Sequence, residues 1–128
     1  MSTPHISVVL AVYNGADRIE RQLEALSAQE FTGPWELVIA DNGSTDGTRQ
    51  VCERWISQLP AMRVIDASAR RGQAAACNIG VDAARGNKLA FCDDDDRVEP
   101  GWLGSLERAL DVHDFVGGAF RFPDDPEI

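Results

Sequence analysis

ISVVLAV, residues 6–12, is rich in β-branched residues and almost continuously apolar. A strand with one solvated face alternates apolar and polar residues, whereas a continuous apolar run is typical of a strand buried on both faces. Strands of that kind belong to parallel sheets that carry helices on both sides. The stretch therefore predicts a central strand of a layered α/β domain.

Strand-like and helix-like segments alternate on the C-terminal side of this stretch. Ile19, Leu23 and Leu26 have the i, i+4, i+7 spacing of one helix face. Strands are expected at 35–41, 62–68, 88–92 and 114–122, and helices at 18–29, before Pro60, at 72–86 and after Pro100. The helix before Pro60 should bury Val51, Trp55, Ile56 and Leu59. This alternation predicts a doubly wound, mostly parallel sheet in a three-layer, Rossmann-like α/β/α fold.

The composition bounds the size of the protein and the class of its partners. The 128 residues are 44% hydrophobic, which fits one domain, residues 1–128, with a sizeable core. A formal net charge of −9 argues against nucleic acid as a partner, because phosphate contacts need clustered Lys and Arg.

The cysteines bear on the compartment in which the protein works. Cys52, Cys77 and Cys92 are widely spaced and form no C-x-x-C pair. This spacing indicates a reducing compartment rather than a disulfide framework or a zinc site. We expect a cytoplasmic protein, or one that lies peripherally at the inner face of the membrane.

Polar residues follow each of the first four predicted strands. The carboxyl ends of such strands meet at one edge of the sheet, where ligands bind. Turns are often polar for purely local reasons, so no single position decides the matter. The residues in question are Tyr13 and Asn14 after the first strand, Asp41 and Asn42 after the second, Arg70 and Arg71 after the third, and Asp93 to Asp96 after the fourth.

The four aspartates in LAFCDDDD, residues 89–96, need a physical reason, because adjacent carboxylates repel. Carboxylates at a strand end are the hard oxygen ligands that Mg²⁺ and Mn²⁺ prefer. Alternation along an extended chain puts Asp93 and Asp95 on one side, and Asp94 and Asp96 on the other. We interpret the run as a D-x-D metal motif, with a solvated acidic turn as the structural alternative.

Several competing motifs are absent from the chain. It has no G-x-G-x-x-G after a strand, no G-x-x-x-x-G-K-[ST] and no G-x-S-x-G. The sequence therefore gives no support to a dinucleotide site, a P-loop or a nucleophile elbow.

Four segments resemble family 2 glycosyltransferases with the GT-A fold: SVVLAVYNGADRIERQLEALSAQ (7–29), WELVIADNGSTDGT (35–48), RGQAAACNIGVDAARG (71–86) and LAFCDDDDRVEPGWL (89–103). The resemblance implies transfer of a sugar from a nucleotide diphosphate donor to a sugar, lipid or protein acceptor. Inversion at the sugar and a divalent metal, Mn²⁺ or Mg²⁺, are usual in that family. Arg70 and Cys77 depart from the family pattern, where Asn and Arg are frequent.

The resemblance also implies roles for individual residues. Tyr13 and Asp41 would contact the nucleobase, and Arg71 would lie near the base or the diphosphate. Asp93 would face the ribose or a metal-bound water, and Asp95 would ligate the metal. The implied nucleotide-sugar site comprises Val12, Tyr13, Asn14, Asp41, Asn42, Arg71, Asp93 and Asp94, and the implied metal site comprises Asp93 and Asp95.

The resemblance implies a catalytic base and an acceptor-binding half beyond the last predicted strand. An inverting transfer needs a base that deprotonates the acceptor hydroxyl. Asp124, Asp125 and Glu127 are tail residues without the features of that base. We therefore expect this chain to be the nucleotide-binding portion of a transferase, either a part of a longer chain or a piece that another chain completes. Its incomplete sheet edge could drive self-association.

Two other functions remain open on the sequence alone. A phosphatase-like hydrolase also places Asp-x-Asp after an apolar strand and uses Mg²⁺, but its motif sits on the first strand and is followed by Thr or Val where this chain has Arg97. A module that binds nucleotide or metal without turnover is the second alternative.

Overall fold

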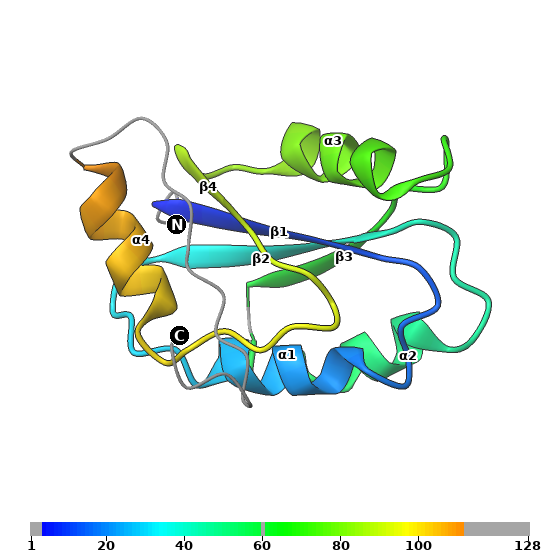
Figure 1. Cartoon of the computed structure of the whole chain (residues 1–128), viewed down its shortest axis with the longest axis horizontal. Helices are drawn as coiled ribbons and strands as arrows, with labels where there is room; N and C mark the ends of the chain where they lie inside the picture. The colour runs from blue at the N-terminus through cyan, green and yellow to red at the C-terminus, as the bar shows by residue number, and fades with distance from the viewer. Residues whose placement is uncertain (1–3, 60, 112–128) are drawn as a thin grey trace, which may run out of the picture.

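Four parallel strands form the centre of the structure, in the order β3-β2-β1-β4 (Figure 1). The structure is a computed structural model and describes residues 4–59 and 61–111. The strands are β1 (Ile6–Val12), β2 (Trp35–Asp41), β3 (Met62–Asp66) and β4 (Lys88–Phe91). All seven residues of β1 are buried. The central, doubly covered strand predicted at residues 6–12 is therefore confirmed.

The helices cover both faces of this sheet. They are α1 (Ile19–Ser27), α2 (Thr48–Glu53), α3 (Gln73–Ala83) and α4 (Trp102–Leu110). Helix α3 lies on one face, α1 and α2 lie on the other, and α4 lies at the end of the sheet where β1 begins (Figure 1). This arrangement confirms the predicted three-layer, doubly wound fold.

The two faces of the sheet are packed differently. Large aliphatic residues, among them Leu10, Leu23 and Ile39, fill the space beneath α1 and α2. Alanines from the sheet and from α3 fill the opposite side. Small residues let α3 approach closely, and a Cβ placed on Gly80 would lie 2.6 Å from Val9 Cγ1. The Ala-rich composition of this helix is therefore explained by the short distance to the strands.

A buried carboxylate joins the amino ends of the strands on the side of α3. Glu36 is only 3% exposed and accepts hydrogen bonds from Ser7 Oγ at 2.6 Å, the Arg85 backbone N–H at 2.6 Å and Arg63 Nη2 at 2.7 Å. Burial raises the pKa of Glu36, but these hydrogen bonds and the Arg63 charge outweigh it, and the pKa lies below its usual value. This network holds β1, β2 and β3 to the end of α3.

The structure corrects two details of the sequence interpretation. Strand β3 ends at Asp66 rather than residue 68, because Asp66 Oδ1 accepts the Ser68 N–H and turns the chain. Helix α2 ends at Glu53 and continues as turns, so the helical repeat stops before Pro60. Ile56, expected in the core, is 54% exposed as a result.

The predicted strand at 114–122 and the tail residues Asp124, Asp125 and Glu127 lie outside the described residues. Within residues 4–59 and 61–111, the helices are too short and too polar to cross a bilayer.

Candidate functional site

A polar hollow lies where the order of the strands reverses, at the carboxyl ends of β1 and β4. In open α/β sheets, ligands bind at such a switch point. The hollow has a volume of about 180 Å³ and is lined by Ala11, Val12, Asn42, Gln73, Ala76, Asp93, Asp94 and Asp95. Four of the eight residues predicted for the donor site, Val12, Asn42, Asp93 and Asp94, therefore line it together with the predicted metal ligand Asp95.

Three carboxylates of the loop after β4 lie close together. We call this loop the acidic loop (residues 93–98). One oxygen from each of Asp93, Asp95 and Asp96 lies within 4.8 Å of the others. The predicted alternation, with Asp96 on the side of Asp94, is wrong. The chain turns at residues 94–95 and the Asp96 N–H meets the Asp93 carbonyl at 3.4 Å, which brings Asp96 back to Asp93.

This donor set fits a hard divalent cation. Carboxylate oxygens are the ligands that Mg²⁺ and Mn²⁺ prefer, and such sites leave positions for water and phosphate. Burial raises the pKa of Asp96, and the charges of Asp95, Asp93 and Asp94 raise it further. The cluster therefore concentrates negative charge that a cation would neutralise.

Asp94 points away from the cluster. Its Oδ2 lies 2.9 Å from Arg18 Nη2, and Arg18 also donates to the carbonyl oxygens of Asn14 at 3.0 Å and Tyr13 at 3.2 Å. A Cβ on Gly15 would lie 2.6 Å from the same carboxylate oxygen. Burial raises the pKa of Asp94, while the Arg18 charge acts in the opposite direction. Asp94 thus joins the acidic loop to the loop after β1.

The Arg71 guanidinium lies over the ring of Tyr13, the residue that follows Val12 of the hollow. The Arg71 guanidinium carbon lies 5.4 Å from the centroid of the Tyr13 ring, and its Nη1 lies 3.4 Å from the Tyr13 hydroxyl. Tyr13 remains 41% exposed. An exposed aromatic ring beside a guanidinium is suited to stacking on another flat ring.

Asn42 uses its side chain to hold the loop that carries Arg71. Its Nδ2 donates to the carbonyl oxygens of Ala67 at 2.7 Å and Arg70 at 2.8 Å, and its Oδ1 accepts the Gly72 N–H at 3.0 Å. Gly72 has a φ of 113°, which favours glycine. Asn42 therefore shapes the site chiefly through this loop.

Hydrogen bonds also tie the loop after β1 to the loop after β2. Asn14, with a φ of 50°, donates its N–H to Ser44 Oγ and accepts the Thr45 N–H on Oδ1, both at 2.8 Å. Asp41 is buried, and its Oδ1 accepts the Ser44 N–H at 3.0 Å. The predicted residue Asn14 thus lies in the loop after β1 and Asp41 at the end of β2, where hydrogen bonds join the two segments.

Three residues of this region were missed by the sequence analysis. Gln73 Nε2 donates to Asp93 Oδ1 at 2.9 Å, Arg18 binds Asp94, and Gln22 binds the backbone of the acidic loop. Gln22 did leave a signal, because it is a polar residue on the apolar face formed by Ile19, Leu23 and Leu26. Nothing in the sequence around Gln73 distinguishes it from an ordinary first-turn residue.

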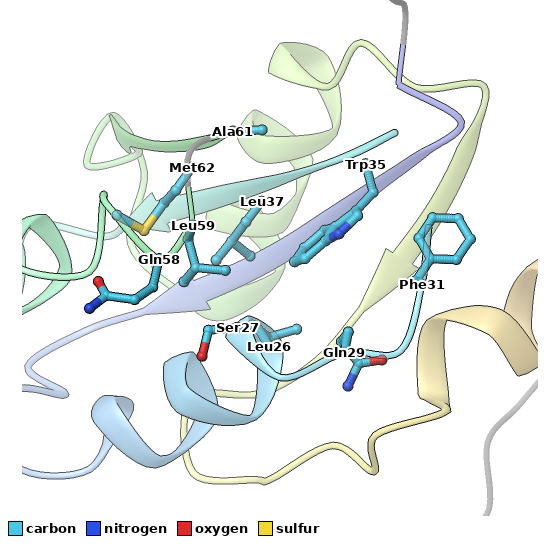
Figure 2. Close-up of a pocket in the computed structure, with 10 residues that line it drawn as sticks. All are labelled: Leu26, Ser27, Gln29, Phe31, Trp35, Leu37, Gln58, Leu59, Ala61 and Met62. Carbon is cyan, nitrogen blue, oxygen red and sulfur yellow. The ribbon is translucent and has the colours of Figure 1, made fainter. Parts of the chain in front are cut away.

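A larger cavity of about 230 Å³ lies at the other end of the sheet (Figure 2). Trp35 and Met62, the first residues of β2 and β3, line it together with Leu26, Leu37 and Leu59. Its lining holds no charged side chain among the described residues, and the acidic loop is at the opposite end of the strands. This cavity shares no lining residue with the polar hollow and is therefore not part of the candidate site.

Comparison with known proteins adds independent findings. The model of a family described as glycosyl transferase family 2 matches residues 7–127. Glycosyltransferase AglE of Haloferax volcanii is 31% identical over 125 residues, which are 93% of this chain and 40% of that protein. The chain therefore spans well under half the length of this relative.

Solved structures resemble the chain in fold as well as in sequence. S. aureus TarS 1–349 in complex with UDP has a TM-score of 0.75 and 28% identity over 85% of this chain and 32% of that one. Mannosyltransferase PcManGT of Pyrobaculum calidifontis, in complex with GDP-Man and Mn²⁺, has a TM-score of 0.66 and 31% identity over 76% of this chain and 29% of that one.

Proposed function

This chain belongs to glycosyl transferase family 2, and from that premise we propose that it forms the donor-binding part of a metal-dependent, inverting glycosyltransferase. The proposal rests on one observation: the carboxylate cluster of Asp93, Asp95 and Asp96 lies at the strand switch point. UDP and GDP-mannose are bound by the similar proteins named above. The donor is accordingly a nucleotide diphosphate sugar.

Asp93, Asp95 and Asp96 would hold the cation, Mn²⁺ or Mg²⁺. A divalent cation there would neutralise the negative charge that develops on the leaving diphosphate. Gln73 fixes one oxygen of Asp93 through its hydrogen bond. Asp94 is turned toward Arg18 and keeps the acidic loop against the loop after β1. Its contribution to donor binding is therefore to place the two loops.

The nucleoside end of the donor would lie on the Tyr13–Arg71 surface. Tyr13 offers its exposed ring face, Arg71 offers a cation near the diphosphate, and Asp41 offers a carboxylate at the end of β2. Val12 forms the floor of the hollow. Because the chain spans 40% of the AglE length, we place the acceptor site and the general base outside the described residues.

Calorimetric titration with UDP, GDP and dTDP, with and without Mn²⁺, tests this function. We expect one nucleotide to bind markedly more tightly when Mn²⁺ is present, because the cation lies between two sets of negative groups. Lack of nucleotide binding under either condition would contradict the donor site. Hydrolysis of a generic phosphate ester would instead favour the phosphatase-like alternative. Nucleotide binding without transfer of the sugar to any acceptor would favour a non-catalytic module.

Two further parts of the proposal concern the surroundings of the protein. We place it in the cytoplasm or at the inner membrane face, since Cys52, Cys77 and Cys92 are free thiols. Cell fractionation tests this location. Among the described strands, β4 is an edge strand with exposed Leu89 and Phe91, and we expect a second copy to pair there. Sedimentation at several protein concentrations should then show a monomer–dimer equilibrium.

A further inference from the structure

Gln22 is a fully buried polar residue on the apolar face of α1. Its Nε2 donates to the Asp93 carbonyl oxygen at 2.9 Å, and its Oε1 accepts the Val98 N–H at 2.9 Å. One side chain therefore holds both ends of the acidic loop. Each of these partners is more than 70 positions away in the sequence, so the contact is made by the fold and not by local turn geometry.

The acidic loop needs such an anchor for a physical reason. Adjacent carboxylates repel one another, and one oxygen from each of Asp93, Asp95 and Asp96 lies within 4.8 Å of the others. Within the loop, the Asp96 N–H reaches the Asp93 carbonyl only at 3.4 Å, which is a long hydrogen bond. The two shorter bonds to Gln22 oppose the spreading that repulsion favours. By fixing the backbone of Asp93, they also fix the position from which its carboxylate projects.

Gln29 offers an internal comparison two helical turns further along the same chain. Its Nε2 donates to the Glu99 carbonyl oxygen at 2.7 Å, and its Oε1 accepts the Leu103 N–H at 2.9 Å. Its Nε2 also donates to the Ala25 carbonyl oxygen at 3.2 Å. Like Gln22, Gln29 bridges two distant backbone groups, but these lie beyond the acidic loop, at Glu99 and at the start of α4. Gln22 therefore binds the two ends of the acidic loop, whereas Gln29 binds the backbone that follows this loop.

We propose that Gln22 is a positioning residue, which sets the spacing of the Asp93, Asp95 and Asp96 carboxylates and thereby the affinity of the site for a divalent cation. This inference rests on the proposed function, because the cation belongs to the donor site described above. Residues that orient metal ligands from behind change metal affinity by about 10- to 100-fold when they are replaced.

The test compares Gln22→Met with Gln29→Met in the 128-residue chain. Both substitutions keep the length of the side chain; Gln22→Met removes two hydrogen bonds and Gln29→Met removes three. Calorimetry with Mn²⁺ alone should show binding about tenfold or more weaker in Gln22→Met and unchanged in Gln29→Met. Amide hydrogen exchange without metal should be faster across residues 93–98 in Gln22→Met only. Thermal unfolding should show that both variants lose stability. A loss of Mn²⁺ affinity in Gln22→Met alone then cannot be caused by general destabilisation.

A further variant keeps the test decisive if Gln22→Met does not fold. Gln22→Asn keeps the amide but shortens the side chain, so it can no longer bridge both ends of the acidic loop and should show faster exchange across residues 93–98. Equal Mn²⁺ affinity in wild type and Gln22→Met, or an equal loss in Gln29→Met, would overturn the inference. A wild-type chain that binds no Mn²⁺ would overturn the proposed function instead, and the exchange data would then still decide whether Gln22 holds the loop.

Discussion

Arg18 and Asp94 form an ion pair with an N–O distance of 2.9 Å, which joins the loop after β1 to the acidic loop after β4. Arg18 binds two backbone carbonyls of its own loop at the same time, those of Tyr13 and Asn14. The Arg18 side chain therefore connects the surface proposed for the nucleobase with the loop proposed for the metal. The two halves of the donor site are mechanically coupled through this contact.

Replacement of Arg18 by Met should lower the free energy of unfolding by about 1 kcal/mol at neutral pH, because the pair is partly exposed and screened by solvent. Burial raises the pKa of Asp94 above its usual value although Arg18 opposes this, so Asp94 takes up a proton at a higher pH than an ordinary aspartate does. The pair then loses its attraction, and the cost of Arg18→Met should shrink on acidification. Urea unfolding at several pH values measures this cost. A cost that grows as the pH falls would contradict the assignment.

Asp96→Asn should weaken the binding of Mn²⁺ about tenfold, because Asp96 belongs to the carboxylate cluster. The same substitution removes a like charge from a crowded loop and should stabilise the metal-free chain by about 0.5 kcal/mol. Mn²⁺ titration and thermal unfolding of the metal-free protein measure the two effects. Asp94→Asn is the matched comparison, since Asp94 lies beside the cluster and is turned toward Arg18, and it should weaken Mn²⁺ binding less than Asp96→Asn does. Loss of affinity in Asp94→Asn alone would show that Asp94, and not Asp96, is the ligand.

Tyr13→Ala should weaken nucleotide binding up to about tenfold, which corresponds to the loss of one stacked aromatic ring. The effect on stability should be small, because Tyr13 is 41% exposed and lies outside the hydrophobic core. Tyr13→Phe keeps the ring and removes only the hydroxyl that Arg71 approaches, so it should bind nucleotide nearly as well as wild type. Calorimetry with the preferred nucleotide distinguishes the variants. Equal affinity in all three proteins would remove Tyr13 from the donor site.

Glu36→Ala should lower the free energy of unfolding by about 3 kcal/mol, because it leaves buried partners of the carboxylate unpaired. Glu53→Ala is the control, since its pair with Arg49 is exposed and should contribute less than about 0.5 kcal/mol. Denaturant unfolding compares the two. Nucleotide affinity should be the same in both variants, because Glu36 lies at the opposite end of the strands from the acidic loop. A change in nucleotide affinity in folded Glu36→Ala would contradict this separation.

The strands were predictable because burial on both faces leaves a continuous apolar run, as at residues 6–12 and 35–41. The bounds of β1 and β2 were accordingly correct to the residue. Ile56 was placed wrongly, since periodicity alone does not show where a helix gives way to turns. The convergence of the polar strand ends also followed from the sequence, because parallel strands share one carboxyl edge.

The side-chain contacts of the site were less accessible to sequence analysis. Asp96 was misplaced because alternation assumes an extended chain, and one turn at residues 94–95 reverses it. Gln22 could have been singled out as a polar residue on an apolar helix face. Gln73 and Arg18 could not, because their partners come from distant segments that only the fold brings together.

Asn42 gives the site a consequence for protein engineering. The loop of residues 67–72 owes its shape to three hydrogen bonds with a side chain that belongs to another segment of the chain. If this loop alone were introduced into a relative, the Asn42 side chain that holds its shape would be missing. Arg71 would then no longer be held over the Tyr13 ring. The transferable unit is therefore discontinuous: residue 42 and the loop must be exchanged together if donor preference is to move with them.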